Sequence, residues 1–169
     1  RENDYYQRMT KSSKSLKEDL FIEMKKRIIE EDESVPYFSN GFWYITRYEK
    51  GKQYPIYTRK KDSLTADEEI LFDCNKLAKG HDYFQLVGVN VSPDNTKVIY
   101  GIDLESRRKY TLYVKNLLTN EVLETNIKNT TGSTAWSSNN NNFFYVKKNE
   151  QTLRPEKVFL HDISKPENL

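Results

Sequence analysis

The chain has 169 residues and a net charge of only +2, from 27 Lys and Arg against 25 Asp and Glu. This balance argues against nucleic acid as a partner and against adsorption to an acidic membrane. One cysteine excludes an internal disulfide, two distant histidines argue against a metal site, and no apolar run approaches the ~18 residues of a membrane-spanning helix.

Residues 1–33 are predicted to form a separate helical extension. Ser15–Glu18 fits a capping box, in which the serine oxygen and the glutamate carboxylate accept from the first free backbone N–H groups. Apolar residues then recur every four positions from Leu16 to Ile28. We expect one amphipathic helix that ends near Glu31, at a solvated acidic run (30–33), and that packs on the rest of its own protein.

The stretch from Ser34 to Lys60 has the pattern of a small antiparallel meander of three strands. Asn40-Gly41 is typical of a two-residue hairpin turn, because both positions of that turn need positive φ. Glu49–Lys52 is a second turn, and the run between the turns is aromatic and β-branched, as in a packed strand. Residues 69–73 supply a fourth strand.

The same meander recurs twice along the chain. Aligned without a gap, 43–59 matches 99–115 at an offset of 56 residues and places Tyr44 on Tyr100. The turn at 91–95 matches 136–140 at an offset of 45, and the strand at 112–114 matches 158–160 at 46. Repeats of this length, each of four short strands, are typical of β-propeller blades. A chance match among aromatic-rich strands is the alternative.

We therefore expect a mainly β fold: a partial β-propeller of about two and a half four-stranded antiparallel blades over 34–169, preceded by the amphipathic helix. The blades are expected at about 36–73, 85–127 and 133–169, with the third one strand short. A blade needs neighbours on both faces of its sheet. The open faces and edges of this chain therefore predict self-association.

The sequence predicts no catalytic, cofactor-binding or metal-binding residue. A nucleophile elbow needs G-x-S-x-G, and the nearest string, Thr131–Ala135, lacks the second glycine. His81 is expected in a polar connector and His161 on the solvent-facing side of a strand, without a nucleophile at triad spacing. The basic, aromatic stretch 50–61 looks like a platform for single-stranded nucleic acid. Its residues follow the blade repeat, however, so nucleic acid is not an expected partner.

Four strings resemble the N-terminal propeller region of the prolyl oligopeptidase family of serine peptidases: SVPYFSNGFWYITRYEKGKQYPIYTRK (34–60), VSPDN (91–95), RRKYTLYVKNL (107–117) and LRPEKVFLH (153–161). The resemblance covers nearly the whole chain. The strings at Ser34–Tyr37 and Tyr54–Tyr57 favour the oligopeptidase B branch of that family.

The resemblance implies a seven-bladed propeller that covers the active site of a C-terminal α/β-hydrolase domain in the same parent chain and admits only short peptides. This branch cleaves after Lys or Arg, so short basic peptides are the implied substrates. The family's Ser, His and Asp would all lie beyond Leu169, so this fragment is expected to be inactive by itself.

Lys50, Lys52 and Arg107-Arg108 are expected in solvent-facing hairpin turns, with no substrate contact assigned. The location is expected to be the cytoplasm, with the periplasm as the alternative. The competing hypothesis is a propeller without enzymatic activity that binds other proteins. The gene sequence beyond Leu169 separates the two, because only the peptidase needs further blades followed by G-x-S-x-G.

Overall fold

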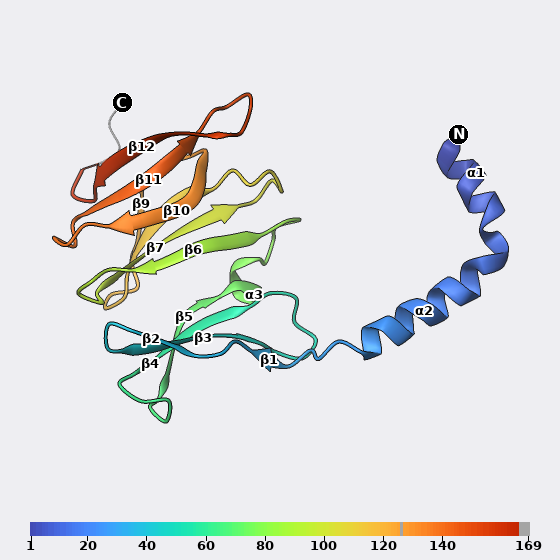
Figure 1. The fold of residues 1–169 in the computed structure, drawn as a ribbon, viewed down its shortest axis with the longest axis horizontal. Coiled ribbons are helices and arrows are strands. Elements are labelled where there is room, and N and C mark those ends of the chain that lie inside the picture. The colour runs from blue at the N-terminus through green and yellow to red at the C-terminus, as the bar shows by residue number, and fades with distance from the viewer. Residues whose placement is uncertain (126, 166–169) are drawn as a thin grey trace.

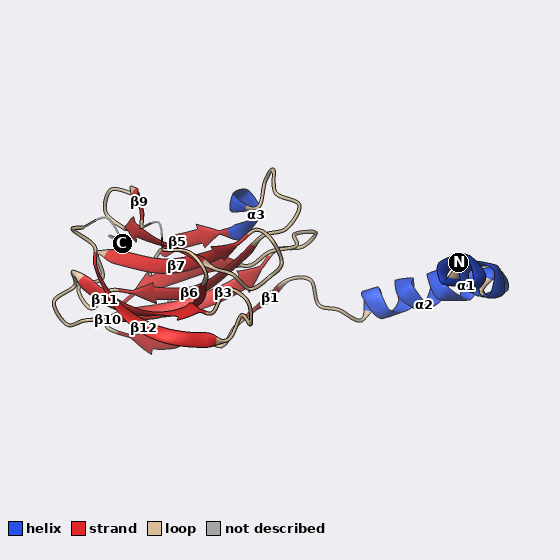
Figure 2. Ribbon diagram, turned by 90° about the horizontal axis from the view of Figure 1, so that it is seen from above, coloured by secondary structure: helices blue, strands red, loops and turns tan. Residues whose placement is uncertain are grey.

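The computed structural model describes residues 1–125 and 127–165 as a bent helical arm attached to three antiparallel sheets (Figure 1). The arm consists of α1 (Glu2–Met9), a 3-10 turn (Lys11–Ser13) and α2 (Lys14–Lys26). A short helix, α3 (Cys74–Leu77), connects the first sheet to the second. Viewed from above, the arm stands clear of the sheets (Figure 2).

Each sheet is a meander whose strands pair in chain order, except that the innermost strand of the first sheet is split into two pieces. We call the sheets blades one, two and three. Blade one contains β1 (Asp32–Glu33), β2 (Tyr37–Ser39), β3 (Phe42–Tyr48), β4 (Ile56–Lys61) and β5 (Glu68–Asp73); blade two contains β6 (Gln85–Val91), β7 (Lys97–Asp103), β8 (Thr111–Asn116) and β9 (Val122–Glu124); blade three contains β10 (Thr130–Trp136), β11 (Asn142–Lys148) and β12 (Pro155–Asp162). The predicted mainly β fold of consecutive antiparallel blades is confirmed.

The turns that join the first two strands of the blades share one backbone feature. Asn40, Asn95 and Asn140 occupy equivalent positions and have φ values of 50°, 60° and 59°. Asparagine adopts this left-handed conformation more readily than most residues. The predicted Asn40-Gly41 hairpin is confirmed, since Gly41 also has positive φ and Ser39 pairs with Phe42 across the turn.

Two apolar clusters fill the spaces between the blades. The cluster between blades one and two includes Phe72, Phe84, Val98 and Tyr100, and the rings of Phe72 and Tyr100 lie 4.5 Å apart. The cluster between blades two and three is built from Ile99, Leu112, Val114, Ile127, Phe143 and Tyr145. Blade two therefore buries both faces of its sheet, as a strand set with alternating apolar side chains requires.

The spacing of the repeat follows from one backbone hydrogen bond that recurs in every blade. The N–H after the third strand donates to the carbonyl before the second strand, from Asp62 to Gly41 (2.9 Å), from Leu117 to Thr96 (2.8 Å) and from Ile163 to Asn141 (2.9 Å). Blades one and two are thus 55 residues apart, and blades two and three are 45 to 46 apart. The second of the predicted offsets is confirmed, and the first is wrong by one residue.

The difference of one residue in this offset changes the face of the sheet on which a side chain is expected to lie. The predicted alignment placed Tyr44 on Tyr100, but Tyr44 points from blade one toward blade two, where it lines a cavity with Gly88 and Val89. Tyr100 points the opposite way, from blade two toward Phe72 of blade one. A shift of one residue along a strand always moves a side chain to the other face. The alignment of aromatic residues alone could not reveal that Tyr44 and Tyr100 lie on opposite faces.

The predicted N-terminal helix is present, but its bounds and its cap differ from the prediction. Ser15 lies inside α2 rather than at its cap, and the N-cap residue, Ser13, makes no side-chain cap bond. The helix ends at Lys26 instead of near Glu31, and Asp32–Glu33 pairs as β1 with Arg47 and Tyr48 of β3. Neither α1 nor α2 buries a residue. Within the described residues the arm therefore does not pack on the blades, and its expected packing on the rest of its own protein stays a prediction.

Candidate functional site

The two histidines lie in separate surroundings. His81 is exposed in the connector, with its ring 6.5 Å from that of Phe84. His161 is buried at 7% exposure, and its ring lies 5.1 Å from that of Phe143. The predicted solvent-facing position of His161 is therefore wrong. The equivalent residue of blade two, Lys115, likewise faces the preceding blade.

No metal site or membrane span emerges from the part of the chain that the structure describes. Over residues 1–125 and 127–165, no three His, Cys, Asp or Glu side chains are grouped to hold a metal ion. No helix within the same residues is long and apolar enough to cross a membrane. The surfaces of this chain that can act on another molecule are therefore judged by their shape, polarity and exposure.

Arg59 is a buried charge that the sequence does not reveal. It is 4% exposed, its Nε donates to the Glu69 carboxylate at 2.7 Å, and its guanidinium carbon lies 4.1 Å from the centre of the Phe42 ring. The pair neutralises its charge within blade one. Arg59 is therefore part of the blade interior and offers no charge to a substrate at the surface.

The helical arm carries ten exposed large apolar side chains. Its large side chains are between 47% and 76% exposed, and they comprise Tyr5, Tyr6, Met9, Leu16, Leu20, Phe21, Ile22, Met24, Ile28 and Ile29, the last two just beyond α2. Charged pairs on its polar side, such as Lys14 with Glu18, occupy i, i+4 positions. A contiguous apolar surface of this kind marks an interaction site.

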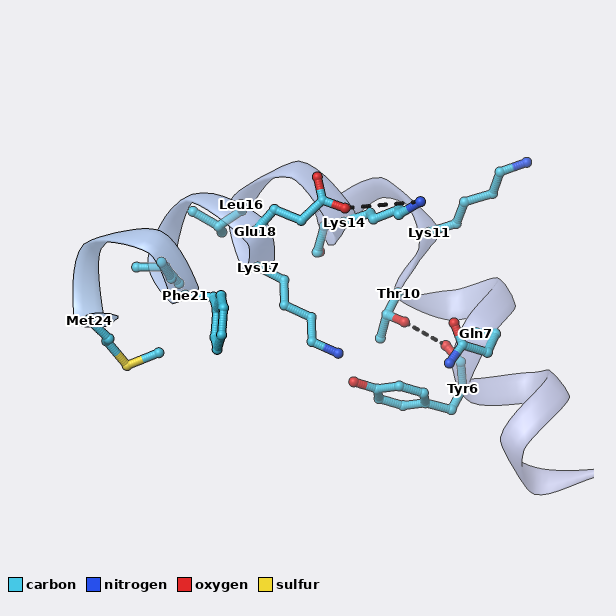
Figure 3. Close-up of a pocket in the computed structure, with 12 residues that line it drawn as sticks. Tyr6, Gln7, Thr10, Lys11, Lys14, Leu16, Lys17, Glu18, Phe21 and Met24 are labelled. Atoms are coloured by element: carbon cyan, nitrogen blue, oxygen red, sulfur yellow. Dashed lines mark hydrogen bonds and ion pairs between the residues drawn. The ribbon is translucent and has the colours of Figure 1, made fainter. Parts of the chain in front are cut away.

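The bend between α1 and α2 shapes that surface into a groove. Thr10 ends α1, where its backbone N–H and its hydroxyl both donate to the Tyr6 carbonyl, at 2.9 and 2.8 Å. Tyr6, Phe21 and Met24 point into the concave side of the bend (Figure 3). The groove has a volume of about 670 Å³. The sequence prediction missed the part from α1, which Tyr6 and Gln7 line.

The side of the blades next to the arm carries the basic hairpins. The β3–β4, β7–β8 and β11–β12 hairpins project on this side, and the asparagine turns lie on the opposite side (Figure 1). Lys50, Lys52, Arg107 and Arg108 are exposed in two of these hairpins, as expected.

Two contacts hold this arm side together. The Gly51 N–H of the β3–β4 hairpin donates to the Glu30 carboxylate at 3.2 Å, which ties the segment after α2 to blade one. Lys148 Nζ of blade three donates to the Arg108 carbonyl of blade two. Burial and the neighbouring Arg108 both lower the pKa of Lys148.

The fold has clear counterparts among known proteins. Oligopeptidase B from Leishmania major matches 95% of this chain with a TM-score of 0.86 at 30% identity, and this chain covers 23% of it. Oligopeptidase B from Trypanosoma brucei, in a closed form with covalently bound antipain, matches 97% with a TM-score of 0.81 at 32% identity, again over 23% of its length.

Two further proteins are similar to this chain in sequence. The chain is 34% identical to dipeptidyl aminopeptidase BI from Pseudoxanthomonas mexicana over 98% of its own length and 25% of that protein. It is 31% identical to Protease 2 from Moraxella lacunata over 80% of its length and 21% of that protein. The chain therefore spans about a quarter of the length of these relatives. The family described as the N-terminal β-propeller domain of prolyl oligopeptidase matches residues 1–168, and this chain belongs to that family.

Proposed function

We propose that this chain is the N-terminal part of a serine peptidase that cleaves short peptides after Lys or Arg, and that its blades cover the active site and select substrates by size. The family match and the two oligopeptidase B structures support this proposal. The reaction would be acyl transfer by a Ser–His–Asp triad in a C-terminal α/β-hydrolase domain. The described residues of this chain would take no chemical part in it.

The observation that carries the proposal is the exposed arm. A match over 95% of the chain leaves about eight residues unmatched, fewer than α1 and α2 contain together, so the match to Oligopeptidase B from L. major includes at least part of the arm. A counterpart of that part is therefore present in a protein roughly four times as long. We propose that its groove packs on the C-terminal domain and there buries Tyr6, Phe21 and Met24.

In this arrangement the blades exclude water and large substrates from the catalytic domain. Closure of a rigid cover around a bound substrate is a common way to separate a reaction from solvent. The cluster between blades two and three supplies stiffness, since its apolar side chains are at most 3% exposed. The basic hairpins at Lys50 and Arg107 repel Lys and Arg side chains, so selection for a basic residue would come from acidic groups in the catalytic domain.

The test compares the full-length protein with residues 1–169 on chromogenic dipeptides that end in Lys, Arg or Ala. The proposal expects full-length protein to cleave the Lys and Arg substrates, and residues 1–169 to cleave none. Cleavage of the Ala substrate at an equal rate would contradict the specificity. Activity of residues 1–169 alone would contradict the assignment of the chemistry to another domain.

We further propose that residues 1–169 self-associate when produced alone. The outward face of blade three exposes Phe144 at 45%, Val158 at 69% and Leu160 at 58%. Apolar strands at an uncovered edge pair readily with other molecules. Sedimentation over a range of concentrations should show mass that rises with concentration, and a single monomeric species at high concentration would refute the proposal.

A further inference from the structure

The two junctions between blades differ in how their innermost strands meet. We call the junction of blades one and two the first seam, and that of blades two and three the second seam. In the second seam β10 lies directly against β6. In the first seam β2 and β6 stand apart, and two cavities of about 300 and 110 Å³ occupy the space between blades one and two.

Hydrogen bonds join the innermost strands of the second seam. Trp136 Nε1 donates to the Asn90 carbonyl at 2.9 Å, and Asn90 Nδ2 donates to the Thr134 carbonyl at 3.0 Å. Gly88 and Gly132 approach so closely that a Cβ atom on Gly88 would lie 2.0 Å from the Gly132 carbonyl oxygen. The backbones themselves are therefore in contact, which only glycine permits.

The first seam has no such bonds. Within residues 1–125 and 127–165, no hydrogen bond links β2 to β6. The outer strands do pack, through the Phe72–Tyr100 contact and a bond from Lys115 Nζ to the Leu71 carbonyl at 3.3 Å. Tyr37 and Tyr44 line both cavities along the inner half of the seam.

Two hydrogen bonds between the asparagine turns of blades one and two close the first seam at the ends of its innermost strands. Asn40 Nδ2 donates to the Pro93 carbonyl, and Asn95 Nδ2 donates to the Asn40 carbonyl at 3.1 Å. We call this pair the asparagine clasp. The second seam has one equivalent bond, from the Asp94 N–H to Asn140 Oδ1 at 3.0 Å, in addition to the strand contacts.

We propose that blade one is hinged on blade two at the asparagine clasp, whereas blades two and three move as one body. Regions with few buried contacts and cavities in their packing open at the lowest free energy. Rotation about the clasp widens or narrows the space between Tyr37 and Val89. Because Glu30 holds the end of the arm to the β3–β4 hairpin, the arm moves with blade one, and a partner bound to the arm would set the width of the seam.

Pairs of spin labels on equivalent hairpins test the hinge in the full-length protein. Lys50, Glu105 and Glu150 are exposed, occupy equivalent places in the three blades, and form one pair across each seam. The variants are Lys50→Cys with Glu105→Cys and, as the matched control, Glu105→Cys with Glu150→Cys. Cys74 does not compete for the labels, because it is 1% exposed and burial raises its pKa to about 12.

The hinge predicts a broader distance distribution across the first seam than across the second. Equal widths would overturn it. Asn95→Gly removes the bond from Asn95 Nδ2 to the Asn40 carbonyl, one of the two bonds of the asparagine clasp, and keeps the positive φ. It should therefore broaden the distance distribution across the first seam and leave the distribution across the second seam unchanged. Asn140→Gly, the matched control, should leave both unchanged, since the Trp136 and Asn90 bonds persist. A first distribution that does not respond to Asn95→Gly would overturn the role of the clasp.

Discussion

The helical arm and the blades contain similar apolar residues but bury them to opposite extents. Phe21 in α2 is 63% exposed, whereas Phe143 in β11 is fully buried between blades two and three. The blades supply each other's packing partners, because three sheets stack face to face. The arm has no such partner within the described residues. Apolar side chains are thus buried between the blades but remain exposed on the arm, whose surface suits contact with another domain.

The largest effect should come from truncating Phe143 in the blades, with truncation of Phe21 in the arm as the control. Phe143→Ala removes a ring that contacts Trp136, Tyr145 and His161, and it should lower the free energy of unfolding by about 3–5 kcal/mol. Phe21→Ala, the control, should change it by less than about 0.5 kcal/mol in residues 1–169. Urea unfolding at low protein concentration measures both. Equal losses would mean that the arm is packed on the blades.

A smaller effect should follow from adding one methyl group at the second seam. Gly88 has φ of +65° and its Cβ would clash with the Gly132 carbonyl, so Gly88→Ala should cost about 2–4 kcal/mol from strain and overpacking. Gly80 has φ of +85° with no atom within 4 Å of its Cβ position, so Gly80→Ala should cost only about 1 kcal/mol. Thermal unfolding of the two variants separates the cost of the clash from the cost of backbone strain alone. Similar losses of stability in both variants would refute the close approach of Gly88 and Gly132.

The smallest effect concerns the asparagine turn of blade two. Burial by itself raises the pKa of Asp94, but hydrogen bonds from Ser92 and Thr96 and the charge of Lys97 lower it below 3.8 overall. The carboxylate therefore stabilises the fold fully above pH 3.8, and this contribution is lost as the pH falls through the lowered pKa.

The test of this turn is Asp94→Asn, which reproduces the residue that blade three carries at the equivalent position, Asn139. It should cost about 1 kcal/mol at neutral pH. The difference from the unchanged protein should shrink in acid, as measured by urea unfolding at several pH values. A difference that grows in acid would show that the pKa of Asp94 is raised instead.

The sequence predicted those features that are set by short-range chemistry. Asn40-Gly41 fixes a hairpin through its positive φ values. Features set by neighbouring blades were not predictable in this way. The faces of Tyr44 and His161 depend on which sheet lies opposite, and the acidic run after α2 supplies β1, whose pairing with β3 is a tertiary contact that helix propensity does not contain.

Of the candidate site, the exposure of Lys50 and Arg107 in hairpins was predicted, but the groove of the arm was not. The groove depends on the bend at Thr10, where a hydroxyl bond to Tyr6 and a 3-10 turn redirect the chain. The apolar stripe of Leu16, Leu20 and Met24 was visible in the sequence. Its partner was expected in the rest of its own protein, and the described residues leave the stripe exposed.

Hydrogen exchange of α2 tests the central claim, that the arm is built to pack on a domain outside these blades. Amides of Lys14–Lys26 should exchange rapidly in residues 1–169, where the helix has no tertiary contact, and slowly in the full-length protein. The strand Lys97–Asp103 serves as the internal reference, because it is paired on both sides in either form. Equally rapid exchange of α2 in both proteins would contradict the account.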